Sequence, residues 1–268
     1  MTITPPALHQ TPADAPHGAV ASPLEVPAGL KGLVVADTTI GDVRGAEGFY
    51  HYRQYSAVEL AEVVAFEDVA HLLLVGELPD ADERAGFAAT LAARRQVPEA
   101  VFAALPTLGA SGAPPLALLA TALSLTAGAL GLRPMVDLGP AERLDDALTL
   151  VGMLPTLVAA SHRLSLGLEP LRPDADLGHA ADYLRMLSGR MPAPAEARAI
   201  DQYLVLTADH GFNASTFAGR VIASTGADLG ACLVGALGAL SGPLHGGAPS
   251  RALDLLDEIG DPARAGEV

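Results

Sequence analysis

Two short segments of this sequence place a histidine among small polar residues and glycines, where its side chain could do chemistry. The first spans residues 209–217 and contains His210 and Asn213. If the segment is helical, these two residues share a face and set an imidazole beside an amide in an otherwise apolar region. The alternative is that His210 is a hydrogen-bonded histidine of the core, and spacing alone does not decide between the two.

The second segment, residues 241–249, carries His245 with glycines on both sides. Ser241 and Gly242 are expected to end one helix and Pro249 to open the next, because proline is well accepted in the first helical turn. His245 then lies in a tight loop, where glycines let a ligand approach the backbone. An imidazole there could donate or accept a hydrogen bond near neutral pH. The alternative is an ordinary Gly-Pro turn with an incidental histidine.

Helices must position both segments, because helical patterns fill most of the chain from Ser56 onward. Ser56 and Glu59 form a capping box, in which the serine oxygen accepts a free backbone N–H and the glutamate reaches back. Apolar periodicity, broken by proline and glycine, predicts further helices over residues 66–75, 81–95, 98–105, 115–131, 141–163, 179–188 and 195–223. Strands are expected only at 32–40 and 49–52, joined by a turn at 41–48. The fold class is therefore mainly α.

Residues 229–240 carry no charge and repeat glycine among alanine and leucine. Each glycine inside a helix costs about 1 kcal/mol relative to alanine. Close approach of another helix is the simplest compensation, either inside the fold or across a dimer interface. In the second case, Gly235→Leu should weaken the dimer. The run is too short to span a bilayer.

Composition excludes several classes of protein. The formal net charge is −15, which disfavours nucleic-acid binding because such proteins present a basic face. The single cysteine, Cys232, excludes an internal disulfide and is expected to be a small buried apolar residue. Residues 1–28 are rich in proline and alanine, show no signal-peptide pattern and are expected to form a flexible tail. We therefore expect a soluble, cytoplasmic protein that binds neither membrane nor nucleic acid.

The two histidine segments together resemble the paired signature of citrate synthases and 2-methylcitrate synthases. His210-Gly-Phe-Asn-Ala-Ser-Thr-Phe217 is similar to the family's "HxxNAST" motif, and Gly242-Pro-Leu-His-Gly-Gly-Ala248 to its "GPLHGG" motif. Upstream, residues 52–60 resemble "YRGY…EL" and residues 178–182 resemble "SHAANF". The likeness extends over residues 29–262, nearly the whole chain.

The resemblance implies a reaction in which an acyl-CoA, usually acetyl-CoA, condenses with oxaloacetate to give citrate and CoA. Making the thioester a nucleophile requires a base at its α-carbon and a donor at its oxygen, where charge develops. His245 matches the family's donor to the thioester oxygen and is the expected catalytic residue. His210 matches the histidine that contacts oxaloacetate, with Asn213 as a second expected substrate-binding residue. The expected supporting positions are Ser215, Gly246 and Gly247.

The same resemblance implies the architecture and the partners. The family is a mostly helical homodimer that binds oxaloacetate and an acyl-CoA; acetyl-CoA is a co-substrate, and neither a separate cofactor nor a metal is expected. Four parts are predicted: a flexible tail at 1–28, a β-hairpin at 29–55, a large helical domain at 56–241, and at 242–268 the catalytic-histidine loop with the start of a small domain.

The sequence also departs from the family pattern. It has no counterpart of the "GFGHRVY" histidine, of the aspartate that acts as base, or of the carboxylate-binding arginines. We therefore expect a chain truncated before most of the small domain and inactive by itself. Gln54, Gly178, Asp182 and Gly219 replace glycine, serine, asparagine and alanine of the family. Two alternatives remain, a non-catalytic paralogue acting as a binding or dimerising subunit, and a 2-methylcitrate synthase that uses propionyl-CoA.

Overall fold

A computed structural model describes residue 27 and residues 33–264, and the chain divides into two units, Met1–Thr38 and Thr39–Val268. In the first unit, residues 33–38 are exposed and form neither helix nor strand. The strand predicted at 32–40 is therefore wrong for the described residues, 33–40. Ile40 accepts the backbone N–H of Arg53 at 3.0 Å, but the first paired strand begins only at Gly41, and pairing with a neighbour is what stabilises an extended segment as a strand. The tail predicted at 1–28 lies outside the described residues, apart from Pro27.

The second unit begins with a small antiparallel sheet in the order β1-β2-β3. Its strands are β1 (Gly41–Arg44), β2 (Phe49–Tyr52) and β3 (Tyr55–Ser56). The predicted strand at 49–52 is confirmed, but its partner comes from the segment predicted as a turn, with Gly41 opposite Tyr52. The actual turn is the 3-10 helix η2 (Gly45–Glu47), and it ends at Gly48, whose φ of +65° favours glycine.

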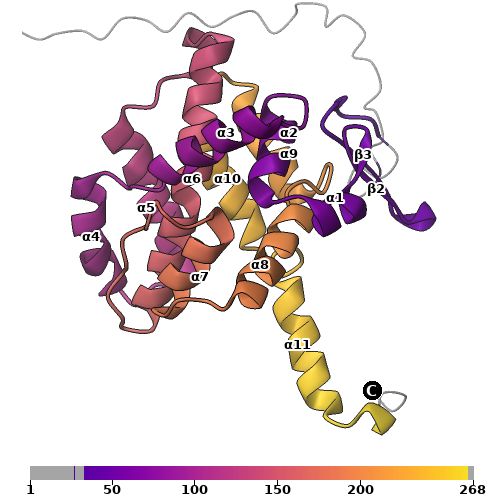
Figure 1. The fold of residues 1–268 in the computed structure, drawn as a ribbon. Coiled ribbons are helices and arrows are strands. Elements are labelled where there is room, and N and C mark those ends of the chain that lie inside the picture. The colour runs from indigo at the N-terminus through magenta and orange to yellow at the C-terminus, as the bar shows by residue number, and fades with distance from the viewer. Residues whose placement is uncertain (1–26, 28–32, 265–268) are drawn as a thin grey trace, which may run out of the picture. The chain divides into compact units, whose positions relative to one another are not determined.

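Helices make up most of the remaining described chain (Figure 1). Local signals set where they begin. Ser56 accepts the N–H of Glu59 at 3.4 Å, and Asp80 and Asp228 cap the helices that follow them. The helices are α1 (Ala57–Val63), α2 (Phe66–Leu74), α3 (Ala81–Ala93), α4 (Glu99–Gly109), α5 (Pro115–Leu130), α6 (Pro140–Ser165), α7 (His179–Ser188), α8 (Pro194–Leu206), α9 (Ala214–Ala223), α10 (Leu229–Leu240) and α11 (Ala248–Ile259), with 3-10 turns η3 (Met135–Asp137) and η4 (Pro262–Arg264).

The largest core lies between α4, α5 and α6, where Leu123 and Leu157 are fully buried. Burial of each such leucine contributes roughly 2 kcal/mol. Leu229 and Leu233 of α10 pack against the same core. A second cluster joins β2, α1, α2 and the end of α8 through Tyr52 and its neighbours. α11, by contrast, projects away from the other helices (Figure 1). The mainly α fold class is therefore confirmed, and the two cores hold α8 and α10, the helices that precede the two histidine loops.

Two segments, Pro115–Asp137 and Pro140–Ser165, are long and apolar enough to cross a membrane by length and composition alone. Their helices, α5 and α6, supply much of the largest core. The core helices of soluble proteins pass the same test, so this finding is weak evidence for a membrane span.

Candidate active site

The first histidine segment spans the loop between α8 and α9 and the first turn of α9, so the single helix predicted over 195–223 is wrong. α8 ends at Leu206 and α9 begins at Ala214. Gly211 has a φ of +67°, and the side chain of Asn213 accepts the N–H of Thr216 at 2.9 Å, which starts the new helix. His210 and Asn213 therefore do not share a helical face. His210 is exposed, which also contradicts the alternative of a core histidine.

Two tyrosines of β2 hold the start of this loop. The hydroxyl of Tyr52 donates to the carbonyl of Val205 at 2.6 Å, and the hydroxyl of Tyr50 donates to the carbonyl of Asp209. Burial raises the pKa of both phenols, so they remain protonated donors at neutral pH. The ring of Tyr50 lies edge-on to the ring of His210, with centroids 6.3 Å apart. The sequence analysis missed this pair, whose only local signal is the alternation of tyrosines along a strand.

The second histidine segment forms the predicted tight loop between α10 and α11. The N–H groups of His245 and Gly247 donate to the carbonyl of Gly242 at 3.0 and 3.3 Å, and that of Gly246 donates to the carbonyl of Leu240 at 3.1 Å. A Cβ atom on Gly246 would lie only 2.1 Å from that Leu240 oxygen. Glycine is therefore required here by the close approach of two backbone segments and not by a left-handed backbone, since φ is positive at none of these glycines.

The two segments meet through a short chain of hydrogen bonds. Nε2 of His245 lies 3.0 Å from Oγ of Ser215, and Ser215 donates to Oδ1 of Asn213 at 2.7 Å. Asn213 is thus committed through its oxygen to Ser215 and Thr216, which leaves its Nδ2 as the group that could donate to a ligand. Among the described residues, His210 makes no hydrogen bond to Asn213, Ser215 or His245. The structure therefore brings together three of the predicted site residues and leaves His210 on the adjoining loop.

This arrangement can orient an imidazole for hydrogen bonding to a ligand. His245 is half-buried, and one of its ring nitrogens is fixed by Ser215, so the other is available to a reacting group. Such a group could stabilise an oxygen on which negative charge develops. Within the described part of the chain, no group of three or more His, Cys, Asp or Glu residues could hold a metal ion.

Comparison with known proteins identifies the family. Residues 29–268 match the model of the citrate synthase C-terminal domain. The citrate synthase of Deinococcus radiodurans is 38% identical over 239 residues, which cover 88% of this chain and 62% of that protein. The chain belongs to the citrate synthase family. The 2-methylcitrate synthase of Mycobacterium tuberculosis is also similar, 39% identical over 243 residues that cover 91% of this chain and 61% of that protein.

Solved structures show the same relationship. Citrate synthase from Pyrobaculum aerophilum superimposes with a TM-score of 0.81 at 37% identity, covering 91% of this chain and 63% of that one. The citrate synthase of Thermoplasma acidophilum, solved as a ternary complex with carboxymethyl coenzyme A and oxaloacetate, superimposes with a TM-score of 0.83 at 27% identity over the same shares. The chain thus spans about three fifths of the length of the relatives it matches.

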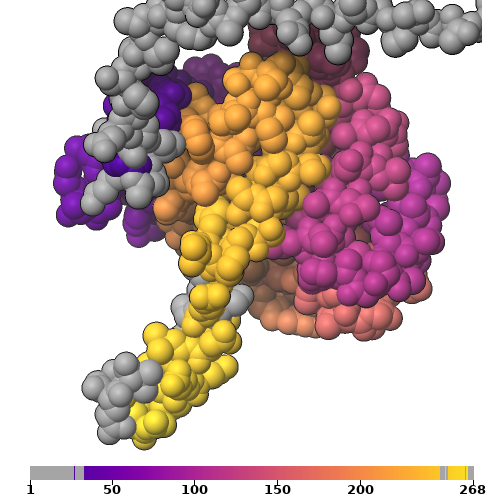
Figure 2. All heavy atoms as spheres, turned by 180° about the vertical axis from the view of Figure 1, so that it is seen from behind, coloured from indigo at the N-terminus to yellow at the C-terminus, as the bar shows by residue number. Residues whose placement is uncertain are grey.

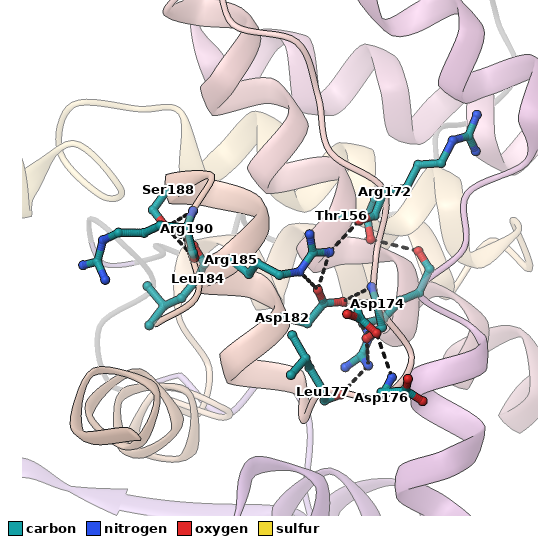
Figure 3. Close-up of polar contacts among 11 residues, drawn as sticks. Thr156, Arg172, Asp174, Asp176, Leu177, Asp182, Leu184, Arg185, Ser188 and Arg190 are labelled. Atoms are coloured by element: carbon teal, nitrogen blue, oxygen red, sulfur yellow. Dashed lines mark hydrogen bonds and ion pairs between the residues drawn. The ribbon is translucent and has the colours of Figure 1, made fainter. Parts of the chain in front are cut away.

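One departure from the family motifs has a clear structural role. Asp182, in place of the family's asparagine, lies beside Arg185 (Figure 3) and also contacts Arg95. Its Oδ1 accepts Nη2 of Arg185 at 2.8 Å, and its Oδ2 lies 3.1 Å from Nε of Arg95. The Arg95 Nε atom makes no hydrogen bond, so this second contact is an ion pair held by charge alone. Oδ2 also accepts the N–H of Asp174, which ties the loop before α7 to the cluster.

A second departure, Gln54, is accommodated by the turn between β2 and β3. The positive φ of this turn, +49°, falls on Arg53 and not on Gln54. The Arg53 side chain donates to the carbonyls of Leu72 and Leu73 at 2.7 and 3.2 Å, which anchors the turn to the end of α2. Position 54 therefore needs no left-handed backbone, and a side chain can replace the family's glycine there.

Proposed function

We propose that the chain contributes to a citrate-synthase-type reaction, the condensation of an acyl-CoA, in the first instance acetyl-CoA, with oxaloacetate to give citrate and CoA. In this proposal His245 is the donor to the thioester oxygen, and His210 contacts oxaloacetate with help from Asn213. Ser215 orients His245, while Gly246 and Gly247 allow the tight loop that carries it. No separate cofactor is required.

The contact between Ser215 and His245 carries the proposal. It joins the two family motifs in space at 3.0 Å, although they are separate in sequence. A donor placed where charge develops typically contributes about 10²–10³ in rate. The geometry supports this role because Ser215 holds the imidazole while His245 remains partly exposed.

The 268-residue chain alone is proposed to be inactive. Its sequence contains none of the family segments that would supply the base, the second histidine and the carboxylate-binding arginines. An apolar cavity of about 430 Å³ between α6, α7 and α8, lined by Leu154, Tyr183 and Leu204 among others, is consistent with a surface that further polypeptide would cover. Loss of several catalytic groups together would reduce turnover below detection.

Propionyl-CoA is the alternative acyl donor, and a non-catalytic subunit is the alternative role. The 39% identity to a 2-methylcitrate synthase, against 38% to a citrate synthase, does not favour either acyl-CoA. As a non-catalytic paralogue, the chain would bind or dimerise with a full-length subunit of the family. A cytoplasmic location is part of the proposal in each case.

A homodimer through α9 and α10 is also proposed. α10 consists only of apolar residues and glycine, yet of its residues only Gly230 and Cys232 are buried, and α9 has no buried residue. Both helices lie on the surface of the rear face of the molecule (Figure 2). An apolar helix that its own chain covers only in part is suited to packing against a second copy.

The test is thiol release from acetyl-CoA or propionyl-CoA in the presence of oxaloacetate. The 268-residue chain would be compared with the product of the reading frame extended past Val268, each with His245→Ala and, as a matched control, His162→Ala at an exposed site on α6. We expect activity only in the longer product, lost with His245→Ala and kept with His162→Ala. Activity in neither product would overturn the catalytic proposal in favour of the non-catalytic subunit.

A further inference from the structure

The first turn of α7 lacks a hydrogen-bond acceptor that the start of a helix normally has. Gly178, the residue before the helix, has no side chain with which to cap it. Glu67 accepts the backbone N–H of His179 at 2.9 Å. Within the described chain, however, the N–H groups of Ala180 and Ala181 have no acceptor. Two adjacent donors at the positive end of a helix are therefore left unsatisfied.

A departure from the family pattern explains why this acceptor is missing. Gly178 stands where the "SHAANF" segment has serine, and the hydroxyl of an N-cap serine accepts from the second or third N–H of its helix. A Cβ atom on Gly178 would lie 3.8 Å from Oε1 of Glu67, an ordinary contact distance. A serine would therefore fit at this position, and the glycine leaves open the space that its hydroxyl would fill.

The unsatisfied donors belong to the wall of a pocket of about 250 Å³ between α2, α7 and α8. The pocket is lined, among others, by Glu67, Gly178, Ala180, Ala181, Arg198 and Asp201. His179 lines it too, is only 4% exposed, and among the described residues neither of its ring nitrogens has a hydrogen-bond partner. A neutral imidazole carries one N–H, so the buried wall holds a further donor without an acceptor.

The charged groups around the pocket leave donors, and not acceptors, to be satisfied. Glu67 is bound to the N–H of His179, and the two oxygens of Asp201 accept from the N–H of Phe66 at 2.9 Å and from Arg198 at 2.7 Å. Arg198 offsets the charge of Asp201, and the positive ends of α2 and α7 offset that of Glu67. The ligand must therefore be an acceptor, and a carboxylate suits adjacent N–H groups at a helix start.

We infer that the start of α7 is a binding site for a small carboxylate anion, whose oxygens accept the N–H groups of Ala180 and Ala181 in place of the missing serine hydroxyl. The pocket exceeds the roughly 30 Å³ of a water molecule and has room for a small organic acid. The site is separate from the two histidine segments and does not rest on the proposed function. A ligand bound there stabilises the folded chain, because the unfolded chain does not present this helix start.

Acetate is the probe, and a single amide can report its binding. His179–Ala180 is the only His-Ala pair in the sequence. Labelling the full 268-residue chain with ¹³C-carbonyl histidine and ¹⁵N-alanine therefore selects the amide of Ala180 in a carbonyl-filtered spectrum. The chemical shift of this amide would be followed at neutral pH during titration with sodium acetate, and separately with sodium chloride at the same ionic strength.

Two substitutions should change the affinity in opposite directions. Gly178→Ser supplies the cap from within the chain and should weaken acetate binding about tenfold or more, because the hydroxyl competes for the same N–H groups. Glu67→Gln keeps an acceptor for His179 but removes a nearby negative charge, and should tighten binding roughly two- to fivefold. Gly139→Ser, at the corresponding position before α6, is the matched control and should leave the affinity unchanged.

We expect a saturable shift of the Ala180 amide with acetate that chloride does not reproduce. A shift that fails to saturate, or that chloride matches, would overturn the assignment to a carboxylate. An affinity that Gly178→Ser leaves unaltered would overturn the location at the start of α7. The measurement uses neither acyl-CoA nor oxaloacetate, so its outcome is independent of the thiol-release test.

Discussion

Asp182 and Arg95 form an ion pair of 3.1 Å whose side chains are 0% and 1% exposed. Removing one partner of a buried pair leaves an uncompensated charge, which typically costs about 3–5 kcal/mol. We therefore expect Asp182→Asn, which restores the family residue, to lower the free energy of unfolding by about 3 kcal/mol. Urea denaturation of the chain measures this change.

The matched control for this prediction is Asp176→Asn, on the loop before α7 and exposed, which should leave the unfolding midpoint unchanged. The double variant Asp182→Asn with Arg95→Met should recover part of the loss, because it removes the stranded charge together with its partner. If Asp182→Asn proves as stable as the unchanged chain, the ion pair does not stabilise the fold.

The stability of the chain is predicted to depend on His179 at mildly acidic pH. Burial, and secondarily the charge of Arg95, lower the pKa of His179 from 6.5 to about 4. Its ring packs on Phe66, with centroids 4.8 Å apart, and Glu67 accepts its backbone N–H at 2.9 Å. Between these two pKa values the unfolded chain binds more protons than the folded one, so stability falls as the pH is lowered from 6.5 to 4.

This shift corresponds to a loss of about 3 kcal/mol by pH 4, and the contribution is fully present above pH 6.5. The free energy of unfolding measured from pH 4 to 8 tests it. His179→Leu should flatten the curve in this window, whereas His162→Leu, at an exposed position, should leave its slope nearly unchanged. A slope that persists in His179→Leu must come from other groups.

The helical elements could be predicted because their signals are local. Caps at Ser56 and Asp228 and prolines in first turns act within a few residues of the helix they start. The error at 195–223 came from reading apolar periodicity across Gly211 and Asn213. Asn213 is a residue type that often caps a helix, so a new helix after it could be expected. The sequence did not show that this cap, and not the continuing apolar periodicity, decides where the helix begins.

The tight loop of the site could likewise be predicted from its glycines, whereas the contacts that support the site could not. Tyr50 and Asp209 are 159 residues apart in the chain. Arg95 lies just after the end of α3, whereas Asp182 lies in α7. Nothing in the local composition pairs them. The β1 strand was missed because pairing with β2, and not the apolar character of residues 32–40, decides which segment becomes a strand.

The hydroxyl of Tyr50 is predicted to keep the His210 loop ordered. Tyr50→Phe removes a donor to the carbonyl of Asp209 and should cost about 1–2 kcal/mol. Because the lost bond is local, backbone amides of residues 206–213 should exchange faster with deuterium, while those of α5 and α6 should not. Tyr203→Phe, an exposed tyrosine on α8, is the control. Unchanged exchange at 206–213 would show that the loop is held without this hydroxyl.

Two glycine-to-alanine substitutions are predicted to have opposite effects. A Cβ atom on Gly219 would meet its neighbours at 3.5 and 3.6 Å, ordinary contact distances, so Gly219→Ala should stabilise α9 by about 1 kcal/mol. A Cβ atom on Gly246 would lie 2.1 Å from the carbonyl oxygen of Leu240, so Gly246→Ala must shift the loop that carries His245. Thermal unfolding measures both, and a stabilising Gly246→Ala would contradict the loop geometry.

The proposed dimer interface through α9 and α10 is best tested by a substitution at Gly238 and not at Gly235. A Cβ atom on Gly235 would lie 2.0 Å from Cδ1 of Ile222, so Gly235→Leu would disturb the packing of α9 and α10 within one chain. Gly238 is exposed on α10 and nothing lies within 4 Å of its Cβ position. A leucine there fits the isolated chain but would collide with a second copy packed closely on α10.

We therefore expect Gly238→Leu to weaken self-association about tenfold or more, with no loss in the free energy of unfolding of the monomer. Light scattering across micromolar concentrations measures the association. Gly86→Leu, on the exposed side of α3 and also without neighbours within 4 Å, is the matched control and should leave the mass unchanged. If the mass of Gly238→Leu equals that of the unchanged chain at every concentration, two copies do not meet at the exposed side of α10 around Gly238.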